Sequence, residues 1–395
     1  MNNQKNAAIQ FIILLGIVSL FGDITYEAAR SVTGPYLAVL GASAVIVGLV
    51  SGLGEFLGYA LRLASGYVAD RTRAYWPITI IGYALILSIP LLAFAGYWHA
   101  AAILIIIERI GKAIRTPARD AMLSHATAKI GRGLGFAIHE AIDQIGAIIG
   151  PLIFSAVFLF KGGYKEGFTI LWIPALLTLV FLIMARIKIP SPERFETSVK
   201  ETMHSTETGK KLPEIFWYYA IFVFFGVAGF ANFQLIAYHL KVQGIVSDIQ
   251  IPIFYAIAMG VDAVVALIIG KTYDKIGFTS LITIPLLTLP IPFLAFSHNY
   301  SFAVISIVLW GAVMGIHETI MRAAIADIVP IERRGTAYGI FNTIYGASWF
   351  IGSVLIGFMY EISINFIFLF VVLMQIISGF VFFMLRGKNK PQIQR

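Results

Sequence analysis

The sequence predicts an all-α integral membrane protein made of two similar halves, each with six membrane-spanning helices. Three observations lead to this fold class. The 395-residue chain is 58% hydrophobic and only 13% charged, with a mean hydropathy of +0.84, whereas a soluble domain is rarely more than about half apolar. The apolar residues fall in runs that are long enough to cross a bilayer, and short motifs of the first half return in the second half.

The membrane-spanning helices are predicted from runs of about 20 mostly apolar residues. The first half contains such runs near residues 9–39, 43–69, 77–96, 98–126, 133–160 and 167–187. The second half contains them near residues 214–240, 251–271, 278–297, 300–328, 335–360 and 363–385. The first run is too long for a signal peptide, so we expect it to remain as a span. Residues 190–213 are polar and are predicted to link an N-terminal half (1–189) to a C-terminal half (214–395).

The Lys and Arg residues between these spans are distributed asymmetrically. Most of them fall in loops on the same side as the N-terminus, and only Lys161, Lys165 and Lys241 fall on the other side. The positive-inside rule therefore places both termini and the linker in the cytoplasm, with the protein in the cytoplasmic membrane. The net charge of +8 is explained by this topology and by contact with anionic lipid, so no nucleic-acid partner is predicted.

Composition and motifs exclude several functions. The chain has no cysteine, so disulfides and thiolate chemistry are excluded. The pairs His139-Glu140 and His317-Glu318 lack the second His of a zinc-protease motif, and no Gly-Lys-Ser/Thr loop for nucleotide phosphates occurs. We therefore predict neither an enzyme nor a bound metal or other cofactor, and we expect a gradient of protons or sodium to supply the driving force.

Two motifs occur once in each half of the chain. The segment Gly66–Arg71 (GYVADR) returns as Gly270–Lys275 (GKTYDK), and Arg132–Ile138 (RGLGFAI) returns as Arg334–Ile340 (RGTAYGI). Each copy lies where an apolar run meets a short basic loop. Internal repetition in a membrane protein is typical of secondary transporters, whose substrate site lies near the bilayer midplane where the repeats meet. Transport is therefore the first functional prediction.

Charged residues inside the predicted spans identify the candidate site. Each costs about 2.5–3.5 kcal/mol at the bilayer centre, so these side chains are expected to face the bundle interior and to mark a pathway. Spacing of three or four residues places many of them on single helix faces. The stripes are Asp23, Glu27 and Arg30 in the first span; Glu55 and Arg62 in the second; Glu108, Lys112, Arg115 and Arg119 in the fourth; His139 and Asp143 in the fifth; and Glu318 and Arg322 in the tenth.

Structural ion pairs are the alternative interpretation of these charges, because buried pairs of this kind occur without a function. We prefer it for the residues near the cytoplasmic ends of the spans, where long side chains can reach the interface. These residues are Arg115, Arg119, Asp120 and Asp327.

At these residues the chain resembles the major facilitator superfamily. That family's loop motif, G-x-x-x-D-R-x-G-R-R, is matched at Gly66, Asp70, Arg71 and Arg73. The glycine that follows D-R-x in the motif is missing here. The second copy has Lys275 in place of Arg. The resemblance implies a cytoplasmic gate. Its expected residues are Gly66, Asp70, Arg71, Arg73, Gly270, Asp274 and Lys275, together with Gly146, Gly150 and Pro151 of the fifth-span motif.

The same resemblance implies a mechanism. The intact fifth-span motif, Gly146-x-x-x-Gly150-Pro151, marks many proton-driven exporters in the family, and Arg109 resembles an Arg that works with a carboxylate in proton coupling. Lys112 and Arg115 replace residues of the family's fourth-span motif, which favours an anionic substrate. The expected mechanism is alternating access between the two halves.

The sequence thus predicts a monomeric transporter in the lipid bilayer that exports a small organic solute against protons. The expected proton-coupling residues are Asp23, Glu27, Arg109, Glu140, Asp143 and Glu318. The expected substrate-binding residues are Arg30, Glu55, Arg62, Lys112, Asp262, Arg322 and Tyr345. Two alternatives stay open: proton-coupled uptake of an anionic metabolite bound by Arg30, Arg62, Arg109 and Lys112, and a membrane sensor or lipid-handling protein that transports nothing.

Overall fold

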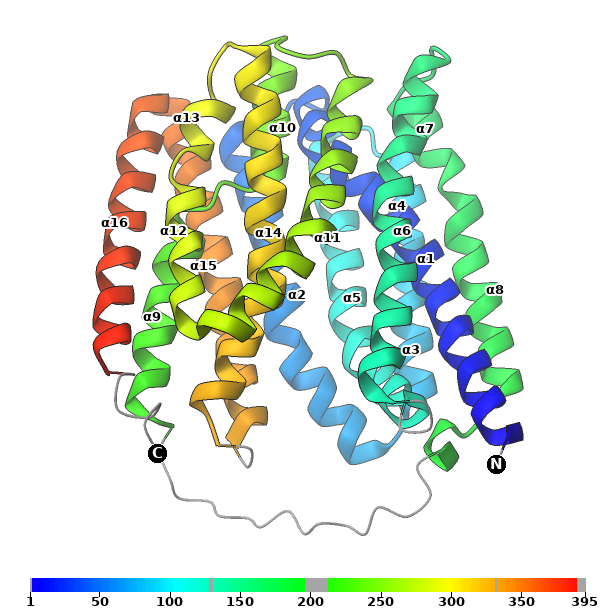
Figure 1. The fold of residues 1–395 in the computed structure, drawn as a ribbon. Coiled ribbons are helices and arrows are strands. Elements are labelled where there is room, and N and C mark those ends of the chain that lie inside the picture. The colour runs from blue at the N-terminus through cyan, green and yellow to red at the C-terminus, as the bar shows by residue number, and fades with distance from the viewer. Residues whose placement is uncertain (1, 128–130, 196–211, 331–332, 389–395) are drawn as a thin grey trace. The chain divides into compact units, whose positions relative to one another are not determined.

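The computed structural model describes residues 2–127, 131–195, 212–330 and 333–388, and within these ranges the chain is almost entirely helical (Figure 1). The described residues contain no β-strand. The all-α prediction is therefore confirmed. The first helices are α1 (Asn2–Val39), α2 (Ala44–Thr72), α3 (Tyr75–Ala84), α4 (Ser88–Leu91), α5 (Trp98–Thr127), α6 (Arg132–Leu159), α7 (Tyr164–Ile170) and α8 (Trp172–Lys188).

The second part of the chain is also helical, and some of its helices are interrupted. Its elements are α9 (Glu214–Ala228), α10 (Phe233–Val242), α11 (Gln250–Ile276), α12 (Thr283–Thr288), α13 (Ile291–Ala295), α14 (Tyr300–Ile328), α15 (Arg334–Ile362) and α16 (Ile364–Lys388). Between α9 and α10 the helix breaks, and Asn232 caps α10 by accepting a hydrogen bond from the Leu235 amide at 2.7 Å. The Ala231 carbonyl at this break accepts from Trp310 Nε1 at 3.0 Å, so a freed backbone group stays satisfied inside the protein.

Ten helical stretches of the described chain are long and apolar enough to cross a membrane. The charged helix α5 is not among them, because its acidic and basic side chains interrupt the apolar run. One stretch, Gln250–Ala295, has 46 residues, which is about twice the length of a single span. The count of twelve spans therefore stays a prediction.

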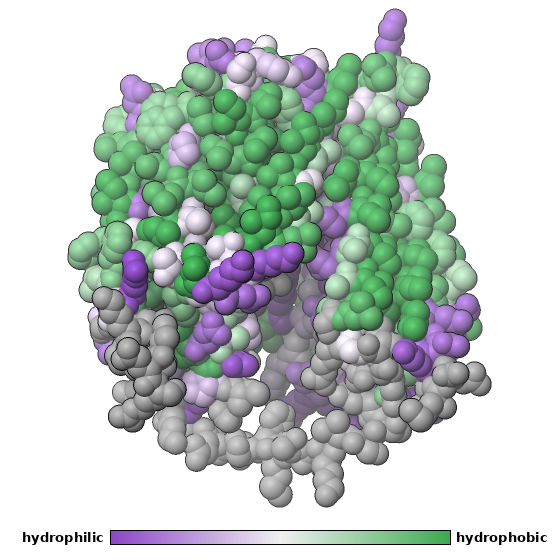
Figure 2. All heavy atoms as spheres, in the orientation of Figure 1, coloured by the Kyte–Doolittle hydropathy of each residue, from purple (hydrophilic) through white to green (hydrophobic). Residues whose placement is uncertain are grey.

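Exposed apolar side chains cover the outer faces of the helices. On α8, Ile173, Leu176, Val180 and Ile183 are each about half exposed or more, and their spacing of three and four residues puts them on one face. Figure 2 shows hydrophobic side chains covering most of the visible helix surface. Apolar patches of this extent are not found on soluble monomers, so the protein is an integral membrane protein.

The chain divides into two compact units. Unit 1 contains α1 as far as Tyr36 and the chain from Leu57 through α8, and unit 2 contains Leu37–Phe56 and α9 to α16. The first half of α2 therefore packs in unit 2, where a methyl group on Gly48 would collide with the Ser353 carbonyl of α15. The expected division at residues 190–213 stays a prediction.

The second half of α2 packs on α5 in unit 1. Pro117 lies inside α5 and has no backbone N–H to donate to the Ala113 carbonyl. That carbonyl instead accepts a hydrogen bond from Ser65 Oγ of α2 at 2.8 Å. The proline thus creates an acceptor in α5 that a neighbouring helix satisfies.

Glycines bring α1 and α6 into backbone contact. A Cβ atom on Gly146 would lie 2.5 Å from the Leu20 carbonyl oxygen, and one on Gly150 would lie 2.6 Å from the Ile24 carbonyl oxygen. Any larger residue would force the two helices apart. This close approach lets short polar side chains of α1 and α6 touch directly.

Candidate functional site

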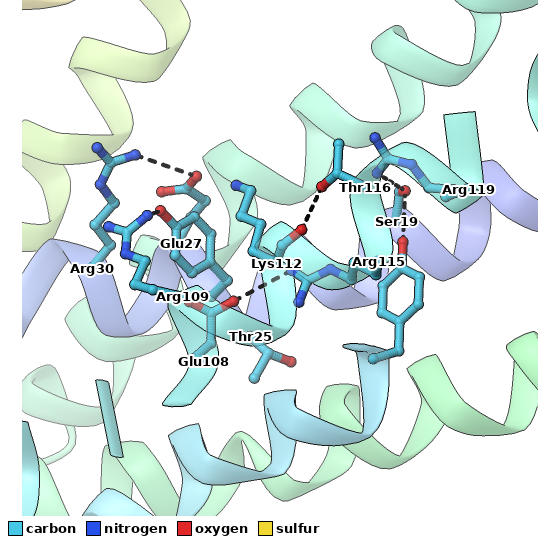
Figure 3. A network of polar contacts seen from close by, with 12 residues as sticks. Ser19, Thr25, Glu27, Arg30, Glu108, Arg109, Lys112, Arg115, Thr116 and Arg119 are labelled. Carbon is cyan, nitrogen blue, oxygen red and sulfur yellow. Dashed lines mark hydrogen bonds and ion pairs between the residues drawn. The ribbon is translucent and has the colours of Figure 1, made fainter. Parts of the chain in front are cut away.

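The charged interior of unit 1 lies between α1, α3, α5 and α6 (Figure 3). Its residues come from consecutive turns of α1 and α5, as the spacing of three and four residues predicts. On α1 these are Ser19, Asp23, Tyr26, Glu27 and Arg30, and on α5 they are Glu108, Arg109, Lys112, Arg115 and Arg119.

Three cations surround the ring of Tyr26. The Lys112 ammonium lies 3.9 Å from the ring centroid, and the guanidinium carbons of Arg109 and Arg30 lie 4.7 Å and 5.8 Å from it. Arg109 also donates a hydrogen bond to the Tyr26 hydroxyl. Glu27 pairs with Arg30 at 3.8 Å. Tyr26, Glu27 and Arg109 are buried, so these cation–π contacts form away from bulk water, where they are strongest.

Two carboxyl groups meet one turn away from this cluster. Asp23 of α1 and Asp143 of α6 interact through a side-chain hydrogen bond, and both feel the charges of Lys112 and Arg119. An ionised carboxylate only accepts hydrogen bonds, so this contact requires a proton on one of the two groups. Glu140, which is exposed, is a third acidic residue that acts electrostatically on Asp143.

A second polar contact joins the same two helices one turn earlier. Ser19 Oγ lies 3.1 Å from His139 Nε2 and accepts a hydrogen bond from Arg119 Nη1 at 3.0 Å. It also lies 3.3 Å from the Tyr83 hydroxyl of α3. Ser19 precedes Asp23 by one helical turn, and His139 precedes Asp143 by one turn. The two contacts therefore lie one turn apart along the α1–α6 interface.

The remaining charges of α5 form close pairs. Arg115 pairs with Glu108 at 3.3 Å, and the two side chains are only 3% and 1% exposed. Arg119 pairs with Asp120 at 2.9 Å. These pairs agree with the structural interpretation of Arg115 and Arg119, although Arg119 also reaches Ser19 and so takes part in the polar network.

Some predicted residues lie apart from this cluster. Arg62 stacks over the Tyr59 ring of its own helix at 4.8 Å, and Glu55 is buried in the part of α2 that belongs to unit 2. The predicted gating residues Asp70, Arg71 and Arg73 are exposed. Arg71 donates a hydrogen bond to the Tyr67 hydroxyl at 2.9 Å. In unit 2 the predicted gating residues Asp274 and Lys275 are likewise exposed.

The predicted site residues of unit 2 lie in varied surroundings. Asp262 is buried on α11, where a Cβ atom on Gly315 of α14 would lie 2.6 Å from its carbonyl oxygen. Glu318 is exposed. The side chain of Arg322 lies outside the described residues. Tyr345 is buried, and its hydroxyl lies 3.3 Å from His317 Nδ1.

Aromatic rings fill the interior of unit 2 around Tyr345. Phe230 packs against Trp310, His317 and Trp349, with ring centroids 5.6, 5.2 and 5.5 Å apart. Such offset and edge-to-face contacts are favourable beyond simple burial. Sequence reasoning missed His317 and Phe230, as well as Ser19 and the hydrogen bond of His139, because these roles depend on partners from distant helices. The one signal available was the placement of His139 on the same helix face as Asp143.

Comparisons with known proteins agree with this architecture. The family described as Major Facilitator Superfamily matches residues 10–352 and 278–395. The uncharacterized protein Rv2265 of Mycobacterium tuberculosis is 40% identical over 96% of this chain and 94% of its own length. The uncharacterized MFS-type transporter MJ1317 of Methanocaldococcus jannaschii is 28% identical over 96% of both chains.

Solved structures add support for the fold. The crystal structure of a point mutant of the nucleoside transporter NupG superposes with a TM-score of 0.74 at 14% sequence identity, covering 96% of this chain and all of the other. At this identity the likeness concerns the fold alone.

Proposed function

The chain belongs to the major facilitator superfamily, and we propose that this secondary transporter carries a small organic anion together with protons across the cytoplasmic membrane. The observation that carries the proposal is the charged interior of unit 1. It combines a group of cations around Tyr26 with a pair of carboxyl groups, Asp23 and Asp143, that share a hydrogen bond. The first is suited to an anion and the second to a proton.

Cotransport is favoured over exchange by the signs of these charges. Ionised carboxylates at Asp23 and Asp143 attract the same Lys112 ammonium group as an anion bound near Tyr26, so protonation of either carboxylate assists anion binding. The sequence alone favours export through the fifth-span motif, with anion uptake as the alternative. The arrangement of Arg30, Arg109 and Lys112 supports anion uptake. Under an inward proton gradient, a cotransported anion moves inward.

The other predicted residues keep subordinate roles in the proposal. Glu27 lies where it can adjust the charge at the anion site, and Asp262 and Tyr345 are the candidates in unit 2. The exposed loop residues Asp70 and Asp274 remain the proposed cytoplasmic gate.

The proposed orientation has both termini in the cytoplasm. Because the chain has no cysteine, single cysteines can report it. Glu193→Cys, in the polar linker, should react with a membrane-impermeant maleimide from the cytoplasmic side, and His298→Cys from the opposite side. Reaction of both residues from one side would contradict the orientation.

The function is tested with purified protein in liposomes that contain a pH-sensitive dye. Small carboxylates and phosphate monoesters are added outside one at a time, each beside a neutral amide or alcohol of the same shape. We expect at least one anion, and not its neutral counterpart, to acidify the liposome interior. Proton efflux in response to neutral or cationic solutes would instead support export. Absence of any proton or solute flux would support a sensor or lipid-handling protein.

A further inference from the structure

Lys112 lies between the two parts of the charged interior of unit 1. Its ammonium group lies 3.9 Å from the centroid of the Tyr26 ring, which Arg30 and Arg109 also contact. It also acts electrostatically on both Asp23 and Asp143. Arg119 acts on the same two carboxyl groups and is the stronger of the two cations at Asp143, while Arg115 acts on Asp23 and Glu140 on Asp143. In the part of the chain that the structure describes, Lys112 forms no ion pair within 4.0 Å. The neighbouring Arg115, by contrast, pairs directly with Glu108 at 3.3 Å.

The charge balance around Tyr26 explains why this position matters. Three cations, Arg30, Arg109 and Lys112, surround the ring, and the acid that pairs there is Glu27. An ammonium group held inside a membrane protein needs a negative partner, because desolvation of an isolated charge is costly. Nearby Glu27 pairs with Arg30, and Glu108, one turn before Lys112, pairs with Arg115. Two further partners can balance the Lys112 charge. One is the ionised form of the Asp23–Asp143 pair, and the other is an anion bound beside Tyr26.

We infer that Lys112 is shared between a proton site, formed by Asp23 and Asp143, and an anion site, formed by Arg30 and Arg109 beside Tyr26, and that this sharing makes protons and substrate bind cooperatively. When the carboxyl pair is ionised, the ammonium group neutralises it. When the pair takes up a proton, the ammonium group is released to the anion. The inference rests on the proposed function and specifies its substrate class, a compact organic molecule with a carboxylate or phosphate group.

The five charged residues have distinct roles in this arrangement. Arg30 and Arg109 provide positive charge in every protonation state, so they set the affinity for the anion. Lys112 provides a charge that depends on the carboxyl pair, so it sets the coupling. By thermodynamic reciprocity, protonation must raise anion affinity by the same factor by which the anion raises proton affinity. We expect this factor to be about 10-fold or more, within the usual range of coupling between sites.

The experiment measures anion binding without transport. The full chain in detergent is screened by thermal shift against succinate, benzoate and glycerol phosphate, each beside a neutral amide or alcohol of similar shape. The anion that stabilises the protein most is then titrated calorimetrically at acidic, neutral and alkaline pH. Comparison of the carboxylate and phosphate probes assigns the anionic group.

The variants separate coupling from affinity. In the wild type, affinity should increase about 10-fold or more on acidification. Lys112→Gln should remove most of this increase and leave the alkaline affinity nearly unchanged, whereas Lys112→Arg should retain it. Arg30→Gln should lower affinity at every pH and retain the increase. Melting temperatures of the variants without ligand confirm that each one is folded.

Two results would overturn the inference. One is a Lys112→Gln protein whose anion affinity still rises on acidification as in the wild type. The other is equal stabilisation of the wild type by anions and their neutral counterparts. Cooperative binding without flux in liposomes would contradict the proposed transport and leave the inference intact. Proton-driven flux in the wild type, together with an unchanged pH dependence of binding in the Lys112→Gln variant, would support the proposed transport and contradict the inference.

Discussion

Helix α5 of unit 1 and helix α14 of unit 2 each precede a copy of the repeated Arg-Gly motif, yet their interiors differ in chemistry. Helix α5 presents buried charges, among them Glu108, Arg109 and Arg115. Helix α14 instead presents Trp310 and His317 to a group of aromatic rings. The two units therefore share a motif and a helical architecture, while charged chemistry is concentrated in unit 1.

Both helices keep one structural feature in common, which is close packing through glycine. In unit 1 a Cβ atom on Gly111 of α5 would lie 2.7 Å from the Gly82 carbonyl oxygen of α3. In unit 2 a Cβ atom on Gly315 of α14 would lie 2.6 Å from the Asp262 carbonyl oxygen of α11. Backbone approach of this kind fixes helix positions independently of the side chains that face the interior. A repeated helical scaffold therefore allows the interior side chains of the two units to differ.

The largest effect expected from this asymmetry concerns coupling. Asp23→Asn and Asp143→Asn should each abolish proton-driven accumulation of the substrate anion, because an amide cannot exchange the proton that the carboxyl pair shares. Glu318→Gln in unit 2 should leave accumulation within about a factor of two, because this side chain is exposed and exposed substitutions have small effects. The measurement is anion accumulation in liposomes under an inward pH gradient.

Anion binding provides the control for these variants. Asp23→Asn should still bind the anion in detergent, which separates lost coupling from lost folding. Accumulation by both aspartate variants, together with its loss in Glu318→Gln, would move the proton site to unit 2 and reverse the comparison.

A smaller effect, on stability, is expected at the buried pair of α5. Glu108→Gln should destabilise the protein by about 3–5 kcal/mol, because it leaves Arg115 buried without its carboxylate. The double variant Glu108→Gln, Arg115→Met should recover much of this loss, since replacement of a whole buried pair is often neutral. Chemical or thermal unfolding in detergent provides the measurement. Equal losses in the single and double variants would indicate that Arg115 acts beyond this pair.

The smallest difference is expected between the two buried histidines. His139→Phe in unit 1 should cost about 1–3 kcal/mol, because it removes the partner of Ser19 from a polar network. His317→Phe in unit 2 should cost less than about 1 kcal/mol, because a phenyl ring can replace the imidazole against Phe230 and Tyr345. Melting temperatures measured side by side test this order. A larger loss in His317→Phe would show that its contact with Tyr345 matters more than ring packing.

The sequence by itself determined the membrane class and the interior placement of charges such as Glu27, Glu108 and Arg109, whereas Glu140 and Glu318, expected inside, are exposed. Long apolar runs require helices that satisfy their own backbone in lipid, and spacing of three and four residues aligned Asp23, Glu27 and Arg30 on α1. These predictions succeed because they depend on the period of a single helix and on the cost of charge in the bilayer.

The tertiary structure alone decided which charges meet. Sequence reasoning put Asp23, Glu27, Arg109 and Asp143 in one proton-coupling set without saying which of them touch. The structure brings Asp23 to Asp143 and places Arg109 on the ring of Tyr26. It also joined Ser19 to His139, and it assigned the first half of α2 to the packing of unit 2. The periodicity of a helix specifies which of its residues share a face, but it does not specify which residues of another helix contact that face. The partner is fixed by the rotation and distance at which helices pack, and in this protein that distance is set by glycine contacts between residues far apart in the chain.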